Sequence, residues 1–81
     1  MPDYSRIRKD VIESLQRYAH QRIPTGGFLE AVLRNDLSDA HAKADMQNRA
    51  ALWQIINYCV NELPPSCWGS DDAVEQHLGR K

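Results

Sequence analysis

Apolar residues recur every three or four positions along most of the chain, which is the pattern of amphipathic helices. The first stripe, with charged residues on the opposite face, consists of Tyr4, Ile7, Val11, Leu15 and Tyr18. It predicts a helix over residues 4–21. Asp3 is suited to cap its start. Pro24 ends it, because the residue before a proline avoids the helical conformation.

Four further helical segments follow. Thr25 is the expected N-cap of a second helix with Phe28 and Leu29 on its apolar face, and residues 37–44 form a short, weakly patterned third segment. Asp45 is suited to cap a fourth helix over residues 46–63. Its apolar residues cover a wide arc and are Leu52, Trp53, Ile55, Ile56, Cys59, Val60 and Leu63. An arc of this width is typical of a central helix that several others touch, so we expect Ile56→Ala to cost about 2–5 kcal/mol.

Pro64 and Pro65 end the fourth helix, and residues 66–69 read as a tight turn. Ser70 is suited to cap a last helix, which Gly79 closes. No segment alternates between apolar and polar residues with period two, so no strand is expected. The sequence therefore predicts an all-α fold: one domain over residues 1–81, a compact bundle of four to five helices around a central helix at residues 46–63.

Composition narrows the class of protein further. The 81 residues are 42% hydrophobic and 26% charged, with a net charge of −1, so no strong field favours nucleic acid or an anionic membrane. No apolar run reaches the length of a membrane span, and the charged N-terminus lacks the apolar region of a signal peptide. We therefore expect a cytoplasmic protein whose cysteines are reduced thiols, with Cys59 as a small core residue.

No residue pattern points to catalysis. His20, His41 and His77 lie far apart in the sequence, and neither they nor the cysteines show the spacing of a zinc site. Nucleophile motifs, phosphate-binding loops and dinucleotide fingerprints are missing from the sequence. We therefore expect no enzyme activity, no metal and no cofactor.

The stretch RIPTGGFLEAV, residues 22–32, places two glycines at the start of the second predicted helix. Unpaired N–H groups and the helix dipole favour anions there, and glycines let a phosphate approach the backbone. The candidate anion-binding residues are Arg22, Thr25, Gly26, Gly27 and Phe28. Alternatively, the glycines let this helix pack under Trp53 or Trp68, with Thr25 as an ordinary cap.

Three more residues are candidate partner contacts: Arg49, Tyr58 and Trp68. Arg22 and Arg49 both project onto mainly apolar arcs, where a charge needs a partner. That partner is an aspartate, a helix C-terminal carbonyl, a bound anion or an interface. Tyr58 falls opposite the core arc, and Trp68 lies in the turn; both are contact residues unless helix one or helix five covers them.

The segments RIPTGGFLEAVLRNDL and NELPPSCWGS, joined by ADMQNRAALWQIINYCV, resemble a family of short proteins common in bacteriophage and prophage genomes. The likeness spans about residues 18–70. It implies a phage-derived protein that works inside a bacterial cell. Small phage proteins of this kind often block, sequester or adjust host components by binding them.

Two functions fit these observations. The first is a small, non-catalytic phage-type protein that binds a host protein, with counter-defence as one such role and a homodimer as its expected state. The second is a binder of a nucleotide or other phosphate ligand at Thr25, Gly26 and Gly27. A DNA-associated regulator is a weaker third, because the net charge of −1 disfavours it.

Overall fold

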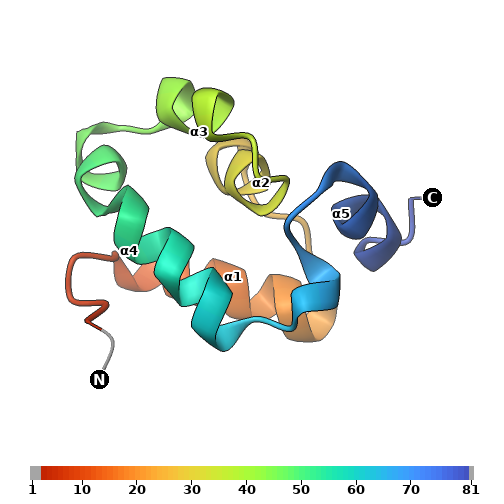
Figure 1. Cartoon of the computed structure of the whole chain (residues 1–81). Helices are drawn as coiled ribbons and strands as arrows, with labels where there is room; N and C mark the ends of the chain where they lie inside the picture. Colours follow the sequence, from red (N-terminus) through yellow and green to blue (C-terminus); the bar gives the residue numbers. More distant parts are fainter. Residues whose placement is uncertain (1–2, 81) are drawn as a thin grey trace.

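The two longest helices, α1 (Lys9–Gln21) and α4 (Met46–Glu62), pack together, with a hydrogen bond from the Gln16 carboxamide to the Tyr58 hydroxyl between them (Figure 1). The computed structural model describes residues 3–80. Its other elements are α2 (Gly27–Leu33), α3 (Leu37–Lys43), the 3-10 helix η1 (Pro65–Cys67) and α5 (Asp71–His77). No strand occurs within residues 3–80, so the prediction of an all-α bundle is confirmed.

A single apolar core joins these helices. Four residues of the stripe predicted on the first helix are buried as expected, with Tyr18 and Leu15 among the largest fully buried side chains, and the fifth, Tyr4, is partly buried. The core side chains that share this interior with α1 come from the other elements: Leu29, Val32, Leu33, Ala40, Ala51, Ile55, Cys59, Cys67 and Val74. The 3.6-residue period of each helix therefore brings one face of every element to the same interior.

Two of the predicted caps, Asp45 and Ser70, are confirmed, and Asp36, which was not predicted as a cap, acts in the same way. The side chains of Asp36, Asp45 and Ser70 accept hydrogen bonds from backbone N–H groups three residues on, at 3.1, 2.8 and 3.1 Å. Each bond satisfies one of the N–H groups that a helix start leaves unpaired. Local sequence therefore sets where α3, α4 and α5 begin.

The start of α1 differs from the prediction. The helix begins at Lys9, and Asp3 does not cap it; its carboxylate instead accepts from the Ser5 amide at 2.9 Å. Residues 4–7 form a turn closed by the Ile7 amide and the Tyr4 carbonyl. A turn keeps the three-residue spacing between Tyr4 and Ile7, so both still reach the core and the periodicity alone could not separate turn from helix.

The apolar arc of α4 is only partly buried. Ile55 and Cys59 are fully buried and Ile56 is half-buried, but Trp53 and Val60 are exposed. The prediction that Trp53 and Val60 belong to the core, and that Ile56 lies deep in it, is therefore wrong. The other helices cover one side of α4 and leave the opposite side open.

Helix α5 is attached by charge as well as by apolar contact. The Arg34 guanidinium pairs with Asp71 at 3.1 Å, with Glu75, and with Glu30 at 3.6 Å. The carboxylates of Glu75 and Asp71, in that order, raise the pKa of Arg34 above its usual value. Arg80 continues the network to Glu30 and Glu75. Two acidic residues of the C-terminal segment are thus neutralised within the chain.

Candidate functional site

The two glycines lie at the start of α2, as predicted, but Thr25 is not the N-cap. Gly26 takes that position with φ −75° and ψ 175°, and the Thr25 hydroxyl is directed to the Gly26 carbonyl at 3.4 Å. The helix therefore begins one residue later than a threonine cap would place it.

Packing does not require these glycines. A Cβ added to Gly26 would meet no atom within 4 Å, and one added to Gly27 would lie 3.6 Å from Cδ of Lys43, an ordinary contact. Neither glycine has a positive φ, so the backbone does not require them either. The alternative that they let α2 pack under Trp53 or Trp68 is wrong, and the space beside them is open.

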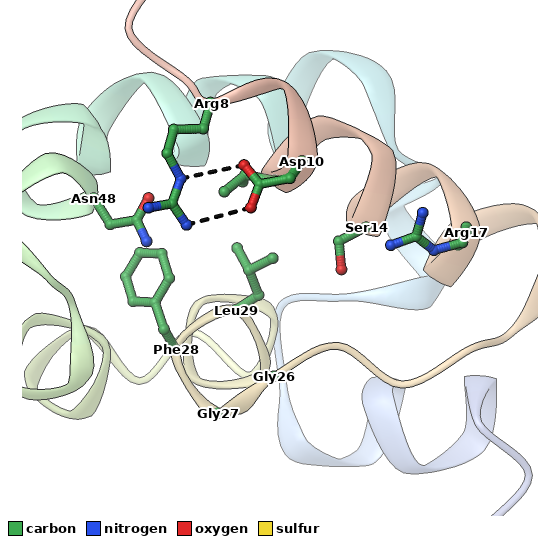
Figure 2. A pocket seen from close by; sticks show the side chains of 10 residues that line it. Arg8, Asp10, Ser14, Arg17, Gly26, Gly27, Phe28, Leu29 and Asn48 are labelled. Carbon is green, nitrogen blue, oxygen red and sulfur yellow. Dashed lines mark hydrogen bonds and ion pairs between the residues drawn. The ribbon is translucent and has the colours of Figure 1, made fainter.

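This open space is part of a cavity of about 380 Å³ between α1, α2 and the start of α4 (Figure 2). Its volume falls in the range of small-molecule sites. The lining residues are Arg8, Asp10, Val11, Ser14, Arg17, Gly26, Gly27, Phe28, Leu29 and Asn48. Three of the five predicted anion-binding residues, Gly26, Gly27 and Phe28, are therefore brought together.

Arg22 and Thr25 do not line the cavity. Arg22 is the left-handed C-cap of α1, with φ 56°, and its side chain is exposed rather than on an apolar arc. Its register could not be extrapolated from α1 because the backbone leaves the helix there. Arg17, one and a half turns earlier on α1, lines the cavity instead.

The two cavity arginines differ in their partners. Arg8 is held by Asp10 at 3.2 Å and by Asp45 at 3.1 Å, and Figure 2 shows its contact with Asp10. No hydrogen bond or ion pair within residues 3–80 involves the exposed Arg17 guanidinium, which points back toward Ser14 in Figure 2. Arg17 is therefore the cation available to a ligand, while Arg8 is held by two carboxylates.

Asn48 was not singled out in the sequence, although it is the most unusual residue of the cavity. Its side chain is 7% exposed, and Oδ1 has no hydrogen-bond partner within the described part of the chain. A buried acceptor without a donor is costly. Its spacing from Ala51 and Ile55 places it on the buried face of α4. A polar residue in an apolar register was the signal that could have identified it.

The predicted partner contacts have other roles. Arg49 is exposed, and its Nε donates to the His41 carbonyl in the last turn of α3 at 3.2 Å, so the alternative of carbonyl capping holds for it. Tyr58 is buried because Gln16 of α1 and the Tyr4 ring cover it, so the alternative that the first helix covers it holds. Trp68 is half-buried against the core.

A different surface of α4 carries exposed apolar side chains. Met46, Trp53 and Val60 are 87%, 71% and 60% exposed and follow one another at intervals of seven residues. Ala50 and Asn57, also exposed, lie between them, which completes alternating spacings of four and three. We call these five residues the outer seam of α4.

Both thiols are interior groups. Cys59 and Cys67 are free and buried, which confirms the core position predicted for Cys59. Burial raises the pKa of Cys59 to about 12, so its thiol stays protonated and unreactive at neutral pH. In residues 3–80 no group of three or more His, Cys, Asp or Glu side chains is arranged to hold a metal ion.

In comparisons with known proteins, no family model, no curated protein and no solved structure matches the chain. Within the described residues, none of the helices has both the length and the apolar character needed to cross a membrane.

Proposed function

We propose that this is a small, non-catalytic binding protein of phage type, which acts inside a bacterial cell by contacting a host protein. The observation that carries the proposal is the outer seam of α4, with Trp53 at its centre. Tryptophan is enriched among the residues that dominate binding energy at protein interfaces. An exposed apolar stripe on an otherwise well-packed domain is typical of an interaction surface.

The spacing of the seam favours a helix as the partner element. Alternating steps of four and three residues are the pattern by which one helix packs along another. The 17 residues of α4 span about 25 Å, enough for several turns of contact. The residues that flank the seam are uncharged except Arg49: Gln47, Gln54, Ile56 and Asn61. A partner helix with its own apolar stripe would therefore meet uncharged side chains along most of these edges, and the exposed Arg49 guanidinium beside Trp53 would favour a carboxylate on that helix.

The experiment begins with a photo-crosslinking residue at exposed position 57 and identification of the captured protein from bacterial cells. The affinity of that purified protein is then measured for the parent chain, for Trp53→Glu and for Leu37→Glu. Leu37 is an exposed apolar residue on α3, outside the seam, and so is the matched control.

We expect Trp53→Glu to weaken binding by about thirtyfold or more, the scale of a hot-spot residue, and Leu37→Glu to leave it unchanged. Equal effects of the two substitutions would contradict the seam. Crosslinking solely to a second copy of the chain would replace host binding with self-association, the homodimer expected from the sequence.

A further inference from the structure

We infer that the cavity between α1, α2 and α4 binds a mononucleotide, with the base at the Asn48 and Phe28 end and the phosphate at the Ser14 and Arg17 end. This goes beyond the proposed function and uses no residue of the outer seam. Figure 2 shows the arrangement. Asn48 and Phe28 lie at one end of the cavity, with Arg8 above them, and Ser14 and Arg17 lie at the other end, further along α1.

The unpartnered carboxamide of Asn48 is the strongest support for a ligand. Its Oδ1 is enclosed without a donor, while the residue lines an otherwise open cavity. A carboxamide offers an acceptor beside a donor, and rotation about its terminal torsion exchanges the two. The edge of a nucleobase presents the complementary pair, which asparagine recognises with two hydrogen bonds. Once this rotation turns the enclosed Oδ1 toward the cavity, a bound base would supply the donor that it lacks.

Phe28 supplies the face for such a base. Its ring is half-buried against the core and lines the cavity beside Asn48. Stacking on an aromatic ring binds any base, because every base has a π-face. Hydrogen bonding from Asn48 and stacking on Phe28 together favour a planar, nitrogen-containing ligand over a simple anion.

The positive charge at the Ser14 and Arg17 end of the cavity favours a phosphate group on the ligand. Of the three charged groups that line the cavity, Arg8 is paired with Asp10 and also with Asp45 next to the cavity, which leaves the Arg17 guanidinium as the lining cation without an ion-pair partner within residues 3–80. The Ser14 hydroxyl lies beside it, and Gly26 adds no side chain to the space. Guanidinium is well suited to phosphate because its N–H groups form charge-assisted hydrogen bonds. Helix α2 has only seven residues, so the inference does not rely on an anion site at its N-terminus.

The test compares the four nucleoside monophosphates AMP, GMP, CMP and UMP with inorganic phosphate, each at millimolar concentration, by thermal unfolding and titration calorimetry. We expect at least one nucleotide to raise the Tm by a few degrees and to bind more tightly than inorganic phosphate. The variants are Arg17→Gln, Asn48→Ala and Arg22→Gln. Arg22 is the matched control, because it is also exposed but lies outside the cavity.

Arg17→Gln and Asn48→Ala should each weaken nucleotide binding by about tenfold or more, and Arg22→Gln should not. Asn48→Ala should also leave the ligand-free Tm unchanged or higher, since it removes an unsatisfied acceptor; a purely structural asparagine would give a lower Tm. The inference is overturned if no nucleotide binds, if inorganic phosphate binds as well as every nucleotide, or if Arg22→Gln weakens binding as much as Arg17→Gln. Because Arg17 is exposed, its variant keeps the test decisive even if Asn48→Ala fails to fold.

Discussion

The hydroxyl of Tyr18 in α1 donates a hydrogen bond to the carbonyl of Cys67 in η1, across 49 positions of sequence, with an oxygen–oxygen distance of 2.6 Å. Both residues are buried. Burial, its largest cause, raises the pKa of Tyr18 above its usual value, so the hydroxyl remains a donor at neutral pH. This bond fixes the segment between α4 and α5 against α1.

Tyr18→Phe should therefore lower the free energy of unfolding by about 1–3 kcal/mol, because the Cys67 carbonyl would stay buried without a donor. Urea denaturation measures the change. Tyr4→Phe is the control, since the Tyr4 hydroxyl donates to Glu62 at an exposed position. Comparable losses of unfolding free energy in the two variants would mean that the buried bond stabilises the fold no more than the exposed one.

The pH dependence of stability should trace in part to Asp45. The pKa of Asp45 is lowered below its usual 3.8, chiefly because its carboxylate accepts a hydrogen bond from the backbone N–H of Asn48. The charge and the hydrogen bond of Arg8 lower it further. A carboxyl group whose pKa is lower in the folded state stabilises the fold above the unfolded value. That contribution is lost as the pH falls through the folded value. Stability should thus decline below about pH 4 as this carboxylate is protonated.

Asp45→Asn keeps an acceptor for the cap but cannot titrate, so its Tm should fall less steeply on acidification than that of the parent chain. Arg8→Gln, which keeps the cap and removes the ion pair, should give an intermediate slope. Thermal unfolding followed by circular dichroism across the acidic range measures these slopes. Parallel slopes for all three proteins would rule out a role for Asp45.

Substitution of the glycines should show that they are not packing devices. Gly27→Ala should leave stability unchanged or raise it by about 0.4–1 kcal/mol, because alanine loses less conformational entropy and its methyl group meets only the flexible Lys43 side chain. Gly26→Ala should cost about 0.5–1 kcal/mol, because alanine is a poor N-cap. If urea denaturation showed that Gly27→Ala lowers the free energy of unfolding by more than about 1 kcal/mol, the packing explanation would be supported instead.

The register of α4 gives the last prediction. Ile55→Ala should cost about 2–5 kcal/mol, the usual range for a fully buried isoleucine. Ile56→Ala should cost about 0.5–2 kcal/mol, because its side chain is only half-buried and loses less apolar area. Denaturant titration of the two variants compares them directly, and the reverse order would show that α4 is rotated about its axis.

Local chemistry explains what could be predicted from the sequence. Asp36, Asp45 and Ser70 begin their helices because each side chain bonds to an N–H three residues away, an interaction that needs no distant partner. The all-α class and the buried stripe of α1 follow from periodicity in the same way. Asp3 and Thr25 are the exceptions, since a capping residue type at a suitable position does not compel a cap.

Tertiary structure decided which polar and apolar residues are covered. Trp53 and Val60 belong to an apolar arc by periodicity, yet no other helix lies over them, and Tyr58 is buried because α1 and Tyr4 happen to cover it. The same holds for the cavity: Gly26 was apparent in the sequence, but Arg17 and Asn48 join it only when α1, α2 and α4 meet. A helix period defines the faces of one helix, whereas burial depends on which neighbour each face meets, and that is a property of the assembled bundle.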